Sequence, residues 1–245
     1  MAIRTFSSKT KKIDFATDLI STDVVRNNLL MYLDAGNTSS YSGTGSTWFD
    51  LSGQSNNATL NNSPTWSSSD GGRFSFNGTT QYASGSINMG NVNQFTIMFT
   101  LQNTSRVGDG QFFCLGNDTS SGGENILVYT GTTFDYAVSC YSPTIYSIQP
   151  RYSPHTLELN KWYNIAITYN ENNSNMYING RYAYSMSSNI TNTTLGTQQW
   201  NLARRLSSAV SNAAGLYSNV LVYNRELTPS EIEKNFNTFR GRYGI

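Results

Sequence analysis

The acidic side chains have the clearest potential for chemistry in this chain, because 15 Asp and Glu residues accompany a single histidine. Two carboxylates that face each other across a sugar, one protonated and one ionised, would hydrolyse a glycosidic bond. The spacing does not favour such a pair, since Glu158 and Glu171 flank a turn, a strand and a further turn. Glu231 and Glu233 fall on a short helix near the end of the chain. The sequence therefore predicts no catalytic residue and no enzyme activity.

Metal-dependent and nucleophilic chemistry lack their usual side chains. His155 is the only histidine, and it follows Pro154 in an expected loop, away from any G-x-S-x-G turn. The Gly-rich run at 121–123 lacks the lysine of a phosphate-binding loop. We therefore expect no bound metal and no cofactor. A structural calcium ion held by Asp109 or Asp118, which lie in Gly-rich loops, is the alternative.

A tyrosine-rich segment at residues 139–154 has the composition of a recognition surface. Tyrosine and serine side chains on loops give flat contact area and adaptable hydrogen bonds. The candidate binding residues are Tyr141, Tyr146, Arg151 and Tyr152. The alternative is a surface loop that its prolines stiffen and that binds nothing.

The first 28 residues differ from the rest of the chain. Four cations precede the first acid, Asp14, and a mildly amphipathic stretch follows them. A segment this short cannot bury its own apolar side chains, so we expect it to be ordered only against another surface. The residues of this N-terminal arm are Arg4, Lys9, Lys11, Lys12, Phe15, Leu19 and Val24. The chain is thus divided into an arm at 1–28 and one domain at 29–245, and a frayed terminus is the alternative for the arm.

Charge, hydropathy and cysteine content narrow the class of protein. The formal net charge is +1, which gives no electrostatic reason to expect nucleic acid or an anionic membrane as partner. We find no signal peptide and no transmembrane run. Cys114 and Cys140 each lie in an apolar, strand-like segment, and we expect two buried thiols, with a bridge between them as the alternative.

Short strands are the elements that must position these residues. Tyr and Phe number 16 and 12, and charged residues make up only 13% of the chain, as is typical of a β-sandwich or barrel. Asn179-Gly180 stands between two strand-like runs and predicts a type I′ hairpin turn. Strands are predicted at 29–33, 73–76, 81–87, 95–101, 111–115, 125–129, 133–140, 156–159, 163–169, 175–178, 181–184, 200–203 and 216–223.

A short helix is predicted directly after the last strand. Thr228 can accept from the backbone N–H of Glu231, while the Glu231 carboxylate reaches back to the N–H of Thr228. Pro229 falls at the first helical position, where its missing donor costs nothing. Glu231 is therefore interpreted as a helix cap and not as a catalytic acid.

Six segments occur in an order that carries more information than any one of them. They are LLMYLDA at 29–35, WFDLSG at 48–53, RFSFNG at 73–78 followed by Gln81-Tyr82, FTI at 95–97, KWYNIAITY at 161–169, and the strand, turn and helix from Leu216 to Glu231. This ordered set resembles the laminin-G-like, concanavalin A-like domains of tailed-bacteriophage structural proteins. The resemblance covers about residues 29–240. It implies an all-β, antiparallel jelly-roll β-sandwich with an N-terminal arm and one short C-terminal helix.

Three departures from the resemblance bear on function and packing. Calcium-binding members often carry an acidic pair in the last strand, where this chain has Ser218 and Asn219. Hydrolases of the superfamily take their carboxylates from an E-x-D-x-x-E strand, which this chain lacks. Phe99 stands at or near a tryptophan of the family and keeps a large ring in the expected core.

The resemblance implies a non-enzymatic structural protein of a phage virion, assembled in the host cytoplasm and displayed on the particle surface. Within that class we expect a capsid decoration or virion-attached protein. Its partners would be other virion proteins, such as capsid, neck or tail subunits, or further copies of itself. The alternative is a tail-fibre or other adhesin that binds host surface glycans. A glycan hydrolase is a third alternative.

Overall fold

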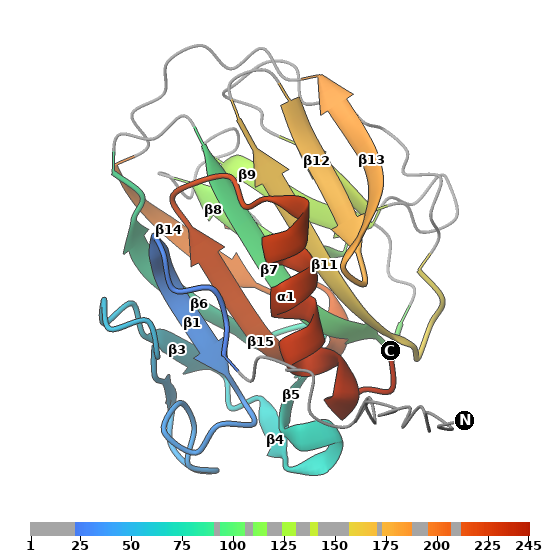
Figure 1. The fold of residues 1–245 in the computed structure, drawn as a ribbon. Coiled ribbons are helices and arrows are strands. Elements are labelled where there is room, and N and C mark those ends of the chain that lie inside the picture. Colours follow the sequence, from blue (N-terminus) through green and yellow to red (C-terminus); the bar gives the residue numbers. More distant parts are fainter. Residues whose placement is uncertain are drawn as a thin grey trace, which may run out of the picture.

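The computed structural model describes residues 23–90, 94–105, 110–116, 124–130, 138–141, 157–170, 173–187, 196–206 and 212–245. In this part of the chain, two mostly antiparallel sheets form a sandwich, and one α-helix lies across the outer face of the larger sheet (Figure 1). The predicted all-β sandwich with a short C-terminal helix is confirmed. No helix in the described ranges is long and apolar enough to span a membrane.

The larger sheet, sheet A, contains eight strands of the described chain, in the order β13-β12-β11-β7-β15-β5-β4, with β1 also paired to β15. Its strands are β1 (Leu29–Asp34), β4 (Thr65–Ser67), β5 (Arg73–Asn77), β7 (Phe95–Asn103), β11 (Trp162–Tyr169), β12 (Asn173–Ile178), β13 (Arg181–Ser187) and β15 (Ala214–Tyr223). The long strand β15 organises the sheet, because it pairs with β7 on one side and with both β5 and β1 on the other.

The second sheet, sheet B, has the order β10-β9-β8-β14-β6-β3-β2 among the described residues. Its strands are β2 (Thr47–Trp48), β3 (Ala58–Asn61), β6 (Tyr82–Asn88), β8 (Gln111–Gly116), β9 (Glu124–Thr130), β10 (Val138–Tyr141) and β14 (Thr197–Leu202). A 3₁₀ helix, η1 (Ser69–Gly71), joins β4 to its neighbour β5 within sheet A.

The main core lies between the two sheets. Ile97, Phe99 and Leu101 alternate along β7 and are fully buried in it. Across the sandwich, the Phe99 ring stacks on Phe113 with 6.2 Å between centroids, and Phe113 stacks on Trp200 at 6.1 Å. Each side chain of this size stabilises the fold by about 1.5–3 kcal/mol when it is fully buried. The predicted core position of Phe99 is confirmed.

A second apolar cluster covers part of the outer face of sheet A. The helix α1 (Pro229–Phe239) places Ile232 and Phe239 in one buried cluster with Met98 and Leu221 of the sheet. A 3₁₀ helix, η2 (Arg240–Arg242), follows directly. The sandwich therefore has a third layer at this position, and the β12–β13 hairpin lies beside it (Figure 1).

The start of α1 follows from its local sequence. The Thr228 hydroxyl accepts from the backbone N–H of Glu231 at 3.3 Å, and the Glu231 carboxylate accepts from the N–H of Thr228 at 2.9 Å. These two bonds satisfy N–H groups that the first helical turn leaves without a partner. Pro229 stands at the first helical position. The predicted capping box is confirmed.

The segment 23–28 packs on the domain, which differs from the expected boundary after residue 28. Val24 is 2% exposed and belongs to the cluster under α1. The N–H of Val25 donates to Asn235 of α1 at 2.8 Å, and the Tyr223 hydroxyl donates to the carbonyl of Val25 at 2.9 Å. Val24 is therefore a packing residue of the domain, because the sheet and α1 supply the apolar surface that the isolated segment lacks. The other predicted arm residues lie outside the described residues.

Local sequence patterns located most of the strands, but they predicted one strand wrongly and missed three short ones. The strand predicted at 156–159 is wrong over its described residues, since 157–160 form no strand and lead into β11 through a turn. Leu157 is nevertheless 1% exposed, so its apolar character reflects core packing. The short strands β2, β3 and β4 were not predicted, because their Ser, Thr and Asn residues are also typical of turns.

Candidate functional site

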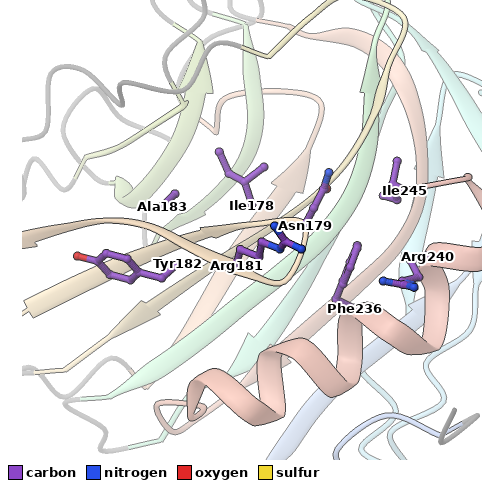
Figure 2. A pocket seen from close by; sticks show the side chains of 8 residues that line it. All are labelled: Ile178, Asn179, Arg181, Tyr182, Ala183, Phe236, Arg240 and Ile245. Carbon is purple, nitrogen blue, oxygen red and sulfur yellow. The ribbon is translucent and has the colours of Figure 1, made fainter.

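A groove of about 480 Å³ lies between the β12–β13 hairpin and the end of α1 (Figure 2). Its walls come from segments that are about fifty residues apart in the sequence, so it exists only in the folded chain. The described residues that line it are Ile178, Asn179, Arg181, Tyr182, Ala183, Phe236, Arg240 and Ile245. The volume falls in the range of about 300–1,000 Å³ that is usual for ligand sites.

The tight turn of the hairpin fixes one wall of the groove. Asn179 and Gly180 have φ values of 51° and 72°, as a type I′ turn requires, and the predicted turn is confirmed. Asn179 is tied to β11, since its N–H donates to the Asn164 carbonyl at 2.8 Å and its side-chain oxygen accepts from the Asn164 N–H at 2.9 Å. A Cβ atom on Gly180 would lie 2.6 Å from a ring carbon of Phe236. Glycine thus allows the turn to rest against α1.

Tyr182 presents an aromatic ring at the open side of this groove. The residue is 58% exposed, which is exceptional for an aromatic side chain in a described strand of this domain. Its ring meets the edge of Tyr177 at a centroid distance of 5.8 Å and an interplanar angle of 81°. Tyr177 itself is 5% exposed and packs in the cluster under α1. A buried ring therefore supports an exposed one, and Figure 2 shows the Tyr182 side chain pointing away from α1.

Two guanidinium groups supply the charge of the groove. Arg181 begins β13, and Arg240 directly follows α1, with its guanidinium 5.8 Å from the centre of the Phe236 ring. Both residues are exposed. Neither forms an ion pair within the described residues, and none of the eight residues that line the groove has an acidic side chain. The groove can therefore offer several N–H donors to a ligand.

The carboxylates of Glu158, Glu226 and Glu231 form contacts outside the groove. Glu231 binds Arg225 through two contacts of 2.8 and 2.6 Å, and this hydrogen bonding, with the cap, lowers the pKa of Glu231 to about 2. The Glu226 carboxylate accepts from Asn170 at 2.6 Å, and Glu158 pairs with Lys161 at 2.7 Å on the surface. None of these groups lies in the groove. The groove thus lacks the pair of acids that glycoside hydrolysis needs.

A buried ion pair lies under the C-terminal segment, on the same face of sheet A. Asp34 is fully buried, and its two carboxylate oxygens accept from the guanidinium of Arg242 at 2.6 and 2.9 Å. The Tyr32 hydroxyl donates to the same carboxylate at 3.2 Å. Burial alone would lower the pKa of Arg242, but hydrogen bonding and the charge of Asp34 raise it. Arg242 therefore keeps its positive charge against Asp34, and the contact is structural.

The positions where the family often carries calcium ligands belong to this buried polar region. The Ser218 hydroxyl donates to the Gly72 carbonyl at 2.7 Å. The Asn219 side chain accepts from Thr100 at 3.1 Å and donates to the Tyr243 hydroxyl at 3.3 Å. Both side chains are fully buried. Neutral hydrogen bonds thus take the place of ligand carboxylates, and no group of metal-ligating side chains occurs in the described ranges.

The W-x-D-L-S-G segment has a structural role. The Asp50 carboxylate accepts from the N–H of Tyr32 at 2.8 Å, from the Ser52 hydroxyl at 2.6 Å and from the N–H of Asn56 at 3.0 Å. Trp48 is fully buried in the main core. The motif therefore ties a loop to β1 and does not form a binding site.

The sequence did not identify the groove. Tyr141 ends β10, and its side chain, like Tyr146, Arg151 and Tyr152, lies outside the described residues. Cys114 is buried in β8, as expected, while the side chain of Cys140 also lies outside them. The sequence feature that could have indicated the groove is the Arg181-Tyr182 pair, which directly follows the predicted Asn-Gly turn. Its second wall comes from the helix region and could not be paired with that turn from spacing alone.

A family model described as the concanavalin A-like lectin/glucanases superfamily matches residues 76–233, and the chain belongs to this family. The predicted laminin-G-like, concanavalin A-like domain is thereby confirmed. A search of curated proteins finds no match.

Solved structures with the same fold include parts of two enzymes and a toxin. A sialidase from Trypanosoma rangeli aligns with a TM-score of 0.64 and 18% identity over 89% of this chain and 33% of its own. Domain 4 of an extracellular arabinanase from Geobacillus stearothermophilus, in complex with arabinotriose, aligns with a TM-score of 0.64 and 15% identity. The alignment covers 85% of this chain and 98% of that domain. The binding domain of botulinum neurotoxin serotype G aligns with a TM-score of 0.55 and 15% identity, over 85% of this chain and 50% of its own. The chain spans a third of the sialidase, and these likenesses show the fold.

Proposed function

We propose that this chain is a non-enzymatic glycan-binding module displayed on a phage particle, and that the groove beside α1 binds the glycan. The observation that carries the proposal is the exposed Tyr182 ring, supported from below by Tyr177 and flanked by guanidinium and amide donors. An aromatic face can stack on the apolar face of a sugar, while N–H donors bind its hydroxyl oxygens. The arabinanase domain with the same fold, solved with arabinotriose, supports a saccharide as ligand.

The proposal favours binding over cleavage. The groove contains no acidic side chain among its described lining residues, while Glu231 serves as a cap and ion pair and Glu226 as a hydrogen-bond acceptor. Glycoside hydrolysis requires one carboxylic acid and one carboxylate on opposite sides of the sugar. A bound saccharide is therefore held and released unchanged.

A glycan array tests this proposal, with bacterial surface saccharides among its probes. We expect the full chain to bind at least one of them, and Tyr182→Ala to weaken that binding tenfold or more. Phe49→Ala is the matched control, because Phe49 is 51% exposed and does not line the groove. Equal binding by the wild type and Tyr182→Ala, or no binding by the wild type, would contradict the proposal.

The N-terminal cations support a second proposal, that the chain is a capsid decoration or virion-attached protein. Four cations fall within the first thirteen residues without an acid among them. A basic segment of this kind can attach to an acidic particle surface, and added salt would weaken that attachment. Since segment 23–28 packs on the domain, the attachment segment is 1–22.

Deletion of residues 1–22 separates the two proposals. We expect the shortened chain to keep its glycan binding and to lose its place on the particle, as measured by its occupancy in purified virions. Normal occupancy of the shortened chain would show that attachment uses the sandwich. Loss of glycan binding in it would show that the ligand site is not the groove alone.

A further inference from the structure

We infer that the saccharide recognised by the groove is acidic, and that Arg181 and Arg240 bind its carboxylates. This inference rests on the proposed function and names the ligand class. Its basis is charge complementarity: two guanidinium groups line one groove, neither has an ion pair in the described chain, and no described lining residue has an acidic side chain.

The contrast with the other described arginines supports this inference. Arg26, Arg73, Arg225 and Arg242 each pair with a carboxylate at 2.8 Å or less. Four of the eight described arginines thus have a carboxylate partner, whereas the two in the groove have none among the described residues. A guanidinium offers parallel N–H donors that match a carboxylate in a two-point contact. A ligand carboxylate would supply the partner that the fold does not.

The position of each cation fits a saccharide that lies along the groove. Arg181 extends from the hairpin wall and Arg240 from the helix wall, with Tyr182 next to Arg181 (Figure 2). The Tyr182 and Arg181 side chains leave consecutive positions of β13 in different directions, so a saccharide that stacks on Tyr182 must extend along the groove to reach Arg181. Arg240 would meet the neighbouring sugar across the groove, above the buried Phe236 ring.

The two arginines are not equivalent. Arg240 stands at the C-terminal end of α1, where its charge also offsets the negative end of the helix dipole. Arg181 has no such interaction, since it opens a strand after a tight turn. We therefore expect Arg181 to contribute the larger share of carboxylate binding.

Calorimetric titration of the full chain with matched saccharides tests the inference. The probes are trigalacturonate, trimannuronate and a hyaluronan tetrasaccharide, each beside its methyl ester, which keeps the sugar and removes the charge. We expect at least one acid to bind tenfold or more tighter than its ester, and to bind more weakly as salt rises. If no acid binds tighter than its ester, the inference is overturned.

Variants assign the effect to the groove. We expect Arg181→Gln to weaken the acid roughly tenfold or more, because a hydrogen bond to a charged group is lost. Arg240→Gln should have a smaller effect, and Arg181→Lys should restore part of the binding. Arg204→Gln, whose guanidinium lies over Tyr82 in another part of the fold, should change nothing. An Arg181→Gln chain that binds the acid as tightly as wild type would also overturn the inference.

The two experiments distinguish a groove that binds glycans without a preference for acids from a groove that binds no glycan. Tyr182-dependent binding of neutral glycans on the array, with no preference for acids in the titration, would retain the glycan-binding function and remove the acidic ligand. Absence of any Tyr182-dependent binding would remove both. The variants in the groove lie at exposed side chains and Arg204 is partly exposed, so thermal unfolding of each variant should match the wild type and show that the chain is folded.

Discussion

Arg240 and Arg242 stand two residues apart in η2 and have opposite surroundings. Arg242 binds the fully buried Asp34 with two hydrogen bonds, under the C-terminal segment. Arg240 is exposed at the groove, against the Phe236 ring and without an ion pair in the described chain. A 3₁₀ helix has three residues per turn, so neighbours two positions apart point in different directions. The same residue type thus serves structure on one side and remains available to a ligand on the other.

This difference extends to the whole outer face of sheet A. Its covered part, under α1 and the segment 23–28, holds polar side chains that bond to one another, as Asn219 does with Thr100 and Tyr243. Its open part, at the β12–β13 hairpin, presents Arg181 and Tyr182 to solvent, with Arg240 of η2 across the groove. A buried polar group without a hydrogen-bond partner destabilises the fold, whereas an exposed one can hydrogen-bond to water until a ligand binds. Whether a polar side chain has a hydrogen-bond or ion-pair partner within the domain therefore separates structural from ligand-binding residues better than its residue type does.

Removal of the N-terminal cover should have the largest effect. Deletion of residues 1–28 removes Val24 and Val25, which are 2% and 8% exposed, and the Val25 bond to Asn235. Two buried valines contribute roughly 3–6 kcal/mol to the free energy of unfolding. Deletion of residues 1–22 should leave that free energy unchanged. Urea unfolding of the two shortened chains checks this, and equal stability would show that segment 23–28 does not belong to the domain.

The two arginines of η2 give the sharpest form of the comparison. Arg242→Gln leaves the Asp34 carboxylate buried without its cation, and should lower the free energy of unfolding by about 3 kcal/mol, at the low end for a buried pair because Arg242 is partly exposed. Arg240→Gln should stay within about 0.5 kcal/mol of the wild type. Thermal and urea unfolding of both variants measure this difference. Similar losses for the two would remove the distinction between a structural and a ligand-binding arginine.

Gly180 connects the turn to the groove and should give an intermediate effect. Gly180→Ala places a Cβ at a positive φ and against Phe236, at a cost of about 1–2 kcal/mol for the left-handed backbone alone. The displaced hairpin should also weaken glycan binding. Unfolding and array measurements on one preparation check both results. A variant as stable as the wild type would show that the turn does not rest on α1.

The helix cap should give the smallest effect, and one that depends on pH. Glu231 has a pKa lowered from 4.5 to about 2, mainly by its hydrogen bond with Arg225. A lowered folded-state pKa contributes stability above about pH 4.5, and this contribution is lost as pH falls toward 2. Glu231→Gln should therefore cost about 1 kcal/mol at pH 7. The difference between the two proteins should shrink below pH 4.5, and a difference that is constant with pH would contradict the role assigned to the carboxylate.

The sequence predicted those parts of the fold that short-range chemistry determines. The Asn179-Gly180 turn, the Thr228 capping box and the strand at 216–223 each follow from residues within about ten positions of one another, and all three are confirmed. The fate of the segment at Val24 could not be predicted in this way. Its partner Asn235 lies more than two hundred positions away, and a pattern of apolar residues does not say which surface will cover them.

The candidate site was missed for the same reason. Arg181 and Tyr182 were placed correctly on a strand after a turn, but their role depends on Phe236 and Arg240 across the groove. Tyrosine-rich loop composition instead directed attention to the segment at 139–154. Composition identifies residues that can bind a ligand, whereas the folded chain decides which of them converge and which already have partners.

Mapping of a bound saccharide by nuclear magnetic resonance tests the central claim most directly. The full chain would be titrated with the tightest ligand from the array, and the backbone amide shifts would be followed across the assigned residues. We expect the largest chemical-shift changes at Asn179–Ala183, Phe236 and Arg240, with little change at the buried Asp34 and Asn219. Shifts confined to the outer face of sheet B, with none at the β12–β13 hairpin, would contradict this expectation.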